Sequence, residues 1–397
     1  MLSFHGHLVY REKMEITKKS DKITPFYVME LLEKARAMEV KGENIVHMEV
    51  GEPDFVTPEA IKEKAIEAIR ENRTFYTHSL GIQELRNKIA AYYYKTEGLE
   101  ISPERIVITN GTSGAFLLLT AVLLDQEKPL GISDPGYPCY KNFALLADAP
   151  VIPIPVTEET NYEITIKHLN ELKNIPETLI ISTPSNPTGT VYHEETIYDI
   201  HKFMSEKGKL IMVDEIYKGL IYGKQSRTAL SISEDIVVIN GFSKTHAMTG
   251  WRLGWMVLPQ ALVRPVQKIA QNVFISPPAI SQYAALRAFD VQDELEVMKG
   301  KYKIRRDFLL PELKKMGFHI PVDPDGAFYI YAGIDKWQID SMTFVKRALK
   351  EAKVALTPGY DFGSFKAESH IRFSYANSLE MLKEGCKRLD LWLKNLF

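Results

Sequence analysis

Lys244 and Arg252 are the residues whose types and spacing most directly indicate chemistry. Lys244 follows a β-branched run at 236–239 that reads as a fully buried strand and breaks at the turn pair 240–241. A lysine just past the carboxyl end of such a strand points into the crevice where open α/β sheets bind ligands. Loss of water there lowers its pKa and makes its amine a nucleophile toward a carbonyl. The alternative is a solvated loop lysine, since most lysines are exposed.

Polar and glycine residues also follow several other apolar strands of the sequence. Loops after parallel strands share one edge of a sheet, so we expect these groups to converge on a single site. The segments concerned are 110–114, 134–138, 184–189 and 214–217, together with Lys244 and Arg252.

The loop at 111–113 is predicted to bind a phosphate. It precedes an apolar helix expected over 114–124, and a glycine turn at a helix N-terminus offers free backbone N–H groups and a positive dipole end. Thr112 and Ser113 add hydroxyl donors at the same place. An ordinary helix cap would use the same residue types, and this alternative stays open.

A dinucleotide-binding site is a sharper alternative for the same loop. Gly111 and Gly114 follow a strand, and Asp134 comes about 20 residues later, as in the dinucleotide fingerprint. The first glycine pair has the wrong spacing, because no Gly-x-Gly occurs there. A phosphate-binding loop of the Gly-Lys-Ser/Thr type is also missing from this position.

Two charged residues are expected at buried positions. Asp214 closes the apolar strand 210–213, and a carboxylate there needs a cationic or donor partner, such as a protonated pyridine nitrogen or a basic side chain. Arg372 lies in an apolar strand at 371–375, where its fork fits a phosphate, a ligand carboxylate or a protein carboxylate.

Three further side chains are candidates for contacts with an aromatic ligand. Tyr217 comes three residues after Asp214, and Asn186 is held in a stiff turn between two prolines. Tyr137, between a glycine and a proline, is able to stack on an aromatic ring. Core packing for the tyrosines and an Asx-turn for Asn186 are the structural alternatives.

Length and composition restrict the class of protein. A chain of 397 residues is too long for one ordinary core, and its net charge of −2 gives no indication of nucleic acid or an anionic membrane as a partner. The two cysteines, Cys139 and Cys386, favour a reducing cytoplasm and exclude a cysteine-based metal site, so no metal is expected. The longest apolar run, 115–124, is too short to span a bilayer. Residues 1–13 lack the pattern of a secretion signal, so we expect either a disordered leader or a true start at Met14.

The order of elements predicts a large α/β domain followed by a smaller α+β domain. Short apolar strands alternate with helices or loops in the central part, as in a mainly parallel sheet covered on both faces. A charged amphipathic helix at 294–316 leads out of it. The predicted domains are 1–51, an N-terminal arm with part of the small domain, 52–298 and 299–397. The strands are expected at 106–109, 130–133, 151–156, 179–182, 210–213, 236–239 and 255–258 in the large domain, and near 45–50, 327–331 and 371–375 outside it.

Taken together, these motifs resemble those of the class I/II aminotransferases, the fold-type-I enzymes that use pyridoxal phosphate. The resemblance covers the chain from about Pro25 to the end, in the order and spacing of the family. It implies the family fold, with a mainly parallel seven-stranded sheet, and transfer of an amino group between an amino acid and a 2-oxo acid. The motifs are at 50–55, 184–189, 214–217, 243–252 and 372–375.

The resemblance implies a role for each candidate near the cofactor ring. Lys244 would hold the cofactor covalently and move a proton at the substrate α-carbon. Asp214 would keep the pyridine nitrogen protonated. Asn186 and Tyr217 would bind the phenolic oxygen of the ring, and Tyr137 would stack on the ring face.

The family pattern also implies a phosphate site and a dimer. Thr112, Ser113 and Arg252 would hold the phosphate, with Ser243 as a possible addition. Tyr76 would reach the phosphate of a partner subunit, which implies a homodimer with shared sites.

Substrate contacts are implied at three residues, with Arg372 pairing with the α-carboxylate while Gly51 and Asn186 lie close to it. A clear second arginine for a distal carboxylate is missing from 272–278, and Ser113 stands where one dicarboxylate-specific branch has lysine. We therefore expect a neutral or aromatic amino donor in preference to aspartate, with 2-oxoglutarate or pyruvate as acceptor. A carbon–sulfur β-lyase using the same cofactor, and a sensor protein that kept the fold, are the remaining alternatives.

Overall fold

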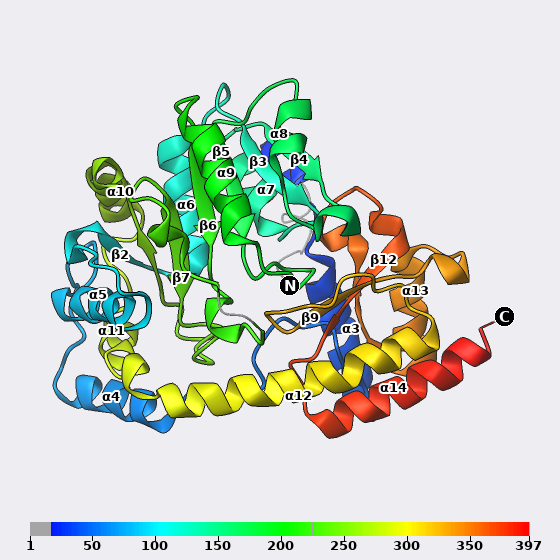
Figure 1. The fold of residues 1–397 in the computed structure, drawn as a ribbon. Helices are drawn as coiled ribbons and strands as arrows, with labels where there is room; N and C mark the ends of the chain where they lie inside the picture. Colours follow the sequence, from blue (N-terminus) through cyan, green and yellow to red (C-terminus); the bar gives the residue numbers. More distant parts are fainter. Residues whose placement is uncertain (1–16, 224–225, 397) are drawn as a thin grey trace, which may run out of the picture.

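The computed structural model describes residues 17–223 and 226–396 (Figure 1). It is an α/β chain with a large seven-stranded sheet and a smaller α+β part. The long helix α12 (Gln292–Met316) runs from beneath the large sheet to the smaller part, as the sequence predicts for 294–316. The expectation for residues 1–13 lies outside the described residues.

The large sheet is mainly parallel, and its strand order is β2-β8-β7-β6-β5-β3-β4. Only β8 runs antiparallel to its neighbours β2 and β7 within this sheet. The predicted seven-stranded sheet is therefore confirmed. Its strands are β2 (Ile106–Thr109), β3 (Leu130–Asp134), β4 (Val151–Pro155), β5 (Thr178–Ser182), β6 (Leu210–Asp214), β7 (Val237–Gly241) and β8 (Gly254–Val257).

Consecutive apolar residues in these strands bury both faces of the sheet. Along β5, Leu179 and Ile181 pack into one hydrophobic cluster, whereas Ile180 between them packs into another. This alternation follows from the period of two in a strand. The first cluster includes side chains of α4 (Glu59–Arg70), α5 (Gln83–Glu97), α8 (Ile166–Glu171), α9 (Glu194–Ser205) and α11 (Ala279–Ala285), and the second those of α6 (Gly111–Leu123), α7 (Cys139–Leu146) and α10 (Gln260–Val273).

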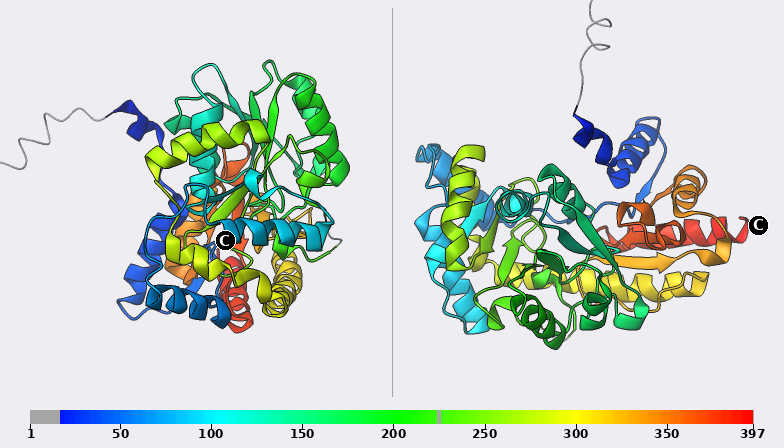
Figure 2. Two further views of the ribbon diagram at one scale, coloured as in Figure 1. Left: turned by 90° about the vertical axis from the view of Figure 1, so that its left-hand side faces the viewer. Right: turned by 90° about the horizontal axis from the view of Figure 1, so that it is seen from above.

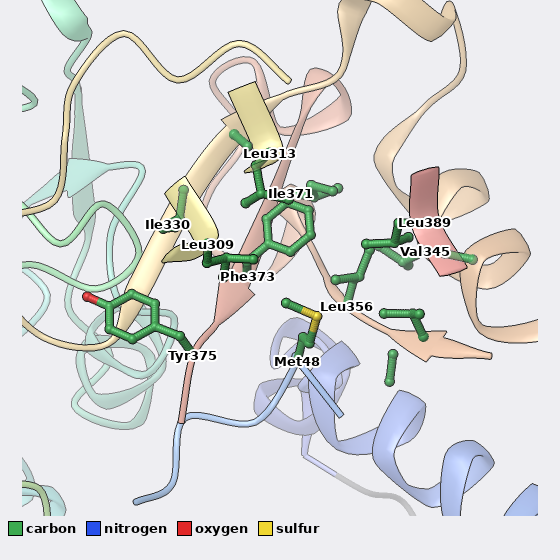
Figure 3. Packing of buried hydrophobic residues seen from close by; sticks show 14 of the residues in the cluster. Met48, Leu309, Leu313, Ile330, Val345, Leu356, Ile371, Phe373, Tyr375 and Leu389 are labelled. Carbon is green, nitrogen blue, oxygen red and sulfur yellow. The ribbon is translucent and has the colours of Figure 1, made fainter. Parts of the chain in front are cut away.

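A third hydrophobic cluster joins the two ends of the chain (Figure 3). Met48 packs there with Phe373 and Leu389, so the N-terminal segment shares its core with C-terminal elements. Figure 2 shows the blue helix α3 (Tyr27–Glu39) against these orange and red elements. The residues before 51 therefore pack with the C-terminal elements, and the division of the chain at 51 and 298 stays a proposal. The smaller part consists of α3, α13 (Ser341–Arg347), α14 (Leu379–Lys394), β1 (Val46–His47), β10 (Val354–Ala355), and the antiparallel sheet β11 (Thr357–Pro358), β12 (His370–Ser374) and β9 (Tyr329–Gly333). The short helix α2 (Lys18–Lys22) has no buried residue and lies against α7 of the large domain.

Most predicted strands and the long helix have bounds within two residues of those in the structure, and two predicted elements differ more. The helix expected over 114–124 begins at Gly111, so the predicted phosphate loop is its first turn. The strand expected over 45–50 is reduced to Val46–His47, which pairs only with β10. Within the described residues, no helix combines the length and the apolar character that crossing a membrane requires.

Candidate active site

Most of the predicted site residues line a single cavity between the large sheet and the smaller part. They come from loops that follow strands of the large sheet, from the segment after β1 and from β12. The expected convergence of strand ends is therefore observed. Of the residues predicted from sequence, the cavity is lined by Gly51, Thr112, Tyr137, Asn186, Asp214, Tyr217, Lys244 and Arg372.

Lys244 lies three residues after β7 and points into this cavity. Its Nζ donates a hydrogen bond to the carbonyl oxygen of Gly51 at 2.6 Å. Burial lowers the pKa of Lys244 to about 8, with the charge of Glu52 opposing the shift and the cations Arg372 and Arg252 adding to it. A larger fraction of this amine is neutral near pH 7 than for an exposed lysine, so it is a better nucleophile.

Asp214, at the end of β6, is a buried carboxylate that is held by neutral donors. Its Oδ2 accepts a hydrogen bond from the Tyr140 hydroxyl at 2.7 Å, and its Oδ1 accepts one from the backbone N–H of Ile216 at 3.0 Å. Burial raises the pKa of Asp214 to about 6. Among the described residues, no lysine or arginine forms an ion pair with it, so a cationic ring nitrogen would supply the missing charge.

Sequence reasoning missed Tyr140. Tyr140 lies in the first turn of α7, three residues after Tyr137, which precedes the helix, and both tyrosines line the cavity. Their rings pack edge to face, with centroids 5.3 Å apart. The sequence carried no local signal for Tyr140, because the carboxylate that it contacts, Asp214, is 74 residues away in the chain.

Arg372 is buried without an acidic partner. Its Nη2 donates to the carbonyl oxygen of Glu49 at 2.6 Å, and its guanidinium lies 4.2 Å from the ring centroid of Tyr329 and 4.9 Å from that of Phe362. Its Nε is buried and has no hydrogen-bond partner among the described residues. The ion pair with a protein carboxylate that the sequence left open is not found within this described part. A small carboxylate ligand would complete this site.

Asn186 contacts Arg372 directly, and Tyr217 contacts Tyr329, whose ring lies against the Arg372 guanidinium. The Oδ1 of Asn186 accepts a hydrogen bond from Nη1 of Arg372 at 2.8 Å, so its amide N–H groups remain for another acceptor. The hydroxyl of Tyr217 lies 2.7 Å from that of Tyr329, another residue that the sequence did not identify.

The first turn of α6 forms a cradle suited to an anion. Gly111 has φ +66°, and a Cβ there would lie 2.7 Å from Nη2 of Arg252. The guanidinium therefore packs directly on the helix N-terminus, where free N–H groups already favour negative charge. Thr112 lines the cavity at this turn, Ser113 is exposed beside it, and Ser243 is buried next to Lys244.

Two residues considered from the sequence, Asp134 and Tyr76, do not line this cavity. Asp134, on which the dinucleotide alternative depended, accepts hydrogen bonds from the backbone N–H groups of Ser364 at 3.0 Å and Phe365 at 3.1 Å. Its carboxylate thus joins the large sheet to the smaller part and is not free for a ribose. Tyr76 is 79% exposed and does not line the cavity of its own chain.

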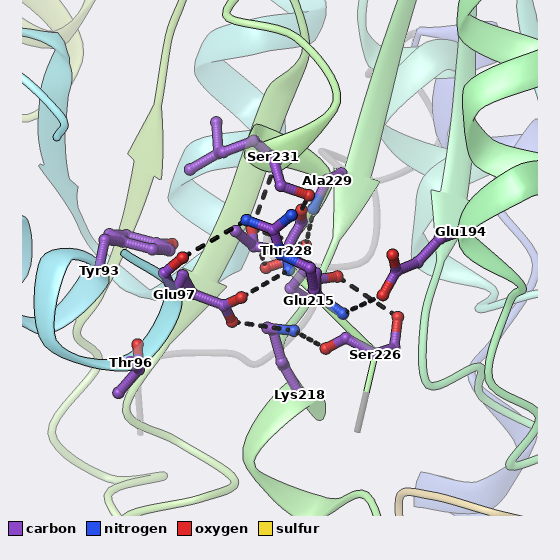
Figure 4. Close-up of polar contacts among 12 residues, drawn as sticks. Tyr93, Thr96, Glu97, Glu194, Glu215, Lys218, Ser226, Thr228, Ala229 and Ser231 are labelled. Atoms are coloured by element: carbon purple, nitrogen blue, oxygen red, sulfur yellow. Dashed lines mark hydrogen bonds and ion pairs between the residues drawn. The ribbon is translucent and has the colours of Figure 1, made fainter. Parts of the chain in front are cut away.

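A buried polar network holds the loop that carries Tyr217 (Figure 4). Glu215 directly follows Asp214, and its carboxylate accepts hydrogen bonds from the Thr228 hydroxyl at 2.9 Å and the Ala229 N–H at 2.8 Å. Lys218, one residue beyond Tyr217, pairs with Glu97 at 3.3 Å. These contacts fix both sides of the loop, so Tyr217 has little freedom to move.

Comparison with known proteins agrees with this geometry. Residues 43–389 match the family model described as aminotransferase class I and II. The chain is 39% identical over 386 residues to the (5-formylfuran-3-yl)methyl phosphate transaminase of Methanocaldococcus jannaschii, covering 95% of this chain and 99% of that one. It is 35% identical to the valine–pyruvate aminotransferase of Mycobacterium tuberculosis, covering 94% and 97%. A crystal structure of an aminotransferase from M. tuberculosis superposes with a TM-score of 0.93 at 34% identity, covering 96% and 100%.

The chain belongs to the class I and II aminotransferase family. It is an aminotransferase, and its cofactor is pyridoxal phosphate. The residues present fit this cofactor on three independent grounds. They offer an amine with a lowered pKa at Lys244, a buried carboxylate without a cation at Asp214, and an anion cradle at Gly111 and Arg252.

Proposed function

We propose that this enzyme moves the amino group of an L-amino acid with a neutral or aromatic side chain to a 2-oxo acid such as 2-oxoglutarate or pyruvate. The observation that carries this proposal is the character of the cavity wall. Apart from Lys244 and Arg372, the described residues that line the cavity include no lysine or arginine. A second substrate carboxylate would be desolvated there without a cation from this chain. The cavity wall instead carries apolar side chains, namely those of Phe26, Val28, Met29, Val50 and Ile216.

The roles proposed for the residues around the cofactor ring follow from their positions. When bound, pyridoxal phosphate supplies an aldehyde carbon and an electron-withdrawing ring. Lys244 would hold that carbon covalently, and its amine would then move the proton between the substrate α-carbon and the C4′ carbon of the cofactor. Asp214 keeps the ring nitrogen protonated, and Tyr137 packs against the ring. Asn186 and Tyr217 donate hydrogen bonds to the phenolic oxygen.

The remaining roles concern the phosphate and the substrate. The first turn of α6, with Thr112 and Ser113, binds the phosphate together with Arg252 and Ser243. Arg372 binds the substrate α-carboxylate through its guanidinium, and Asn186 and Gly51 border the same position. The bidentate geometry of the guanidinium orients the α-carbon toward Lys244.

Single-turnover bleaching of the cofactor absorbance with a panel of amino acids tests the substrate preference. Valine, alanine and phenylalanine are expected to bleach the holoenzyme band about 5- to 150-fold faster than aspartate, because an unpaired polar group in the cavity costs about 1–3 kcal/mol. The variant Met29→Lys should raise the rate with aspartate relative to phenylalanine, since Met29 lines the cavity and is 48% exposed. Met29→Gln, of similar length without charge, should not.

Equal or faster bleaching with aspartate in the unmodified enzyme would refute the proposed preference. The same experiment addresses the β-lyase alternative. Release of ammonia and pyruvate from a β-substituted amino acid, without accumulation of the aminated cofactor, would replace transamination by elimination as the principal reaction of this chain.

We also propose that the enzyme is a homodimer in which Tyr76 binds the phosphate in the partner's site. Large apolar side chains are exposed at two adjacent loops, with Phe75 and Tyr76 each 79% exposed and Ile275 48% exposed. The loops are joined by the Thr77 N–H, which donates to the Ser276 hydroxyl at 3.3 Å. Such a patch favours burial against a second copy.

The free thiols of Cys139 and Cys386 support the proposed cytoplasmic location.

Light scattering and cofactor titration test the dimer. The expected mass is twice the 45.3 kDa of one chain. Tyr76→Phe should weaken cofactor binding by about tenfold or more without changing that mass, because it removes a hydrogen bond to a charged group. Tyr94→Phe is a suitable control, since Tyr94 is 62% exposed on α5 and has no proposed role. A monomer, or unchanged cofactor affinity in Tyr76→Phe, would contradict the shared site.

A further inference from the structure

Tyr329 is a buried side chain that touches three residues of the proposed site. Its hydroxyl lies 2.7 Å from that of Tyr217, and the guanidinium of Arg372 lies 4.2 Å from its ring centroid. A Cβ added at Gly51 would overlap the hydroxyl oxygen of Tyr329, so the backbone of Gly51 packs directly on this hydroxyl. Tyr329 is only 1% exposed, and nothing in the family roles described above assigns it a function.

The strand register explains why Tyr329 meets Arg372. In the antiparallel pair of β9 and β12, Arg372 lies opposite Tyr331, and Tyr329 is two residues before Tyr331. Residues two apart on a strand face the same side, and a diagonal neighbour is within reach of a long side chain. The ring of Tyr329 is therefore held under the guanidinium by the sheet itself.

The hydroxyl pair has a restricted set of proton positions. Burial raises the pKa of both Tyr217 and Tyr329, so both phenols keep their protons at neutral pH. A phenol has one proton to donate. If Tyr217 donated to Tyr329, it would have none left for the phenolic oxygen of the cofactor. Tyr217 is able to donate to a ligand only when its oxygen accepts the proton of Tyr329.

We propose that Tyr329 is a positioning residue that acts through two neighbours. Its hydroxyl donates to Tyr217 and so directs the Tyr217 proton toward the cofactor's phenolic oxygen. Its ring supports the guanidinium of Arg372 in the orientation that binds the substrate carboxylate. This inference rests on the roles proposed above for Tyr217 and Arg372.

Spectroscopic pH titration and KM measurements on holoenzyme variants separate the effect of the Tyr329 hydroxyl on Tyr217 from the effect of its ring on Arg372. In Tyr329→Phe, the pH midpoint of the cofactor's visible band should rise by about 0.2–0.5 pH unit, a fraction of one hydrogen bond, because a Tyr217 hydroxyl that no longer accepts from Tyr329 is a weaker donor. The rise follows because weaker donation from Tyr217 stabilises the phenolate form of the cofactor less. The KM for the amino donor should stay within about twofold, since the ring remains under Arg372.

A second variant removes the ring as well. Tyr329→Leu should raise the midpoint and, in addition, raise the KM about fivefold, the equivalent of one cation–π contact. Tyr302→Phe is the matched control. Tyr302 is equally buried at 1%, and its hydroxyl makes no hydrogen bond within the described part of the chain, so both midpoint and KM should be unchanged.

Tyr217→Phe distinguishes failure of this inference from failure of the proposed function. A raised midpoint in Tyr217→Phe with an unchanged midpoint in Tyr329→Phe would overturn the proposal for Tyr329 alone. Unchanged midpoints in both variants would overturn it together with the role proposed for Tyr217. An unchanged KM in Tyr329→Leu would remove the support of Arg372.

Discussion

Replacing Lys244 with alanine is expected to lower turnover by at least about a thousandfold while leaving the fold intact. The loss combines the covalent attachment of the cofactor with proton transfer at the substrate α-carbon, and general acid–base catalysis alone contributes about 10²–10⁴-fold. The amine makes one hydrogen bond, to the carbonyl oxygen of Gly51, so little stability depends on it. Steady-state kinetics with the preferred donor, together with a thermal melt, would measure both effects.

Lys299→Ala is a matched control for this experiment. Lys299 borders a different cavity and pairs with Glu296 on α12, so its removal should leave turnover unchanged. Turnover in Lys244→Ala at a level close to that of the control would show that another group carries the cofactor. An unfolded Lys244→Ala protein would contradict the expectation that this residue is not structural.

Replacing Arg372 with alanine is expected to lower kcat/KM by about 2–5 kcal/mol, or roughly 30- to 5000-fold, mainly through KM. The guanidinium is buried, its Nε has no hydrogen-bond partner among the described residues, and it is held in place by Glu49, Asn186 and two aromatic rings. Its removal would leave the substrate carboxylate desolvated without a cation. The visible absorbance of the bound cofactor should persist, because the proposed phosphate and ring contacts are made by other residues.

Arg372→Lys keeps the charge but loses the fork, so it should recover only part of the lost affinity. A KM in Arg372→Ala equal to that of the unmodified enzyme would show that Arg372 is structural. Loss of the cofactor absorbance in both variants would also contradict the separation of substrate and cofactor contacts proposed here.

The part of the site that lies on strand ends was predictable from sequence. Asp214 and Lys244 follow apolar runs that are recognisable as buried strands, and the carboxyl ends of parallel strands meet at one edge. The same reasoning gave the seven-stranded sheet. Gly111 was predicted to lie in a loop that binds phosphate, and the structure shows that the helix begins at that residue instead of at Gly114. The local sequence pattern predicts these positions because the end of a strand, the turn after it and the start of the next helix all lie within a few residues.

The contacts made across the fold were not predictable in the same way. Tyr329 reaches Tyr217 over a separation of 112 residues, and Arg372 reaches the carbonyl of Glu49 over 323. Nothing in the local pattern around Tyr329 distinguishes it from a core tyrosine, since it lies in an apolar strand. The short β1 was over-predicted at 45–50 because an apolar run indicates burial but not the length of the partner strand.

The most direct test of the central claim is borohydride reduction of the holoenzyme followed by peptide mapping. Reduction fixes the carbon–nitrogen link between an amine and the aldehyde of the cofactor. The account predicts that the cofactor mass is found on the peptide that contains Lys244 and on no other lysine. An unmodified Lys244, with the cofactor attached elsewhere, would contradict the account.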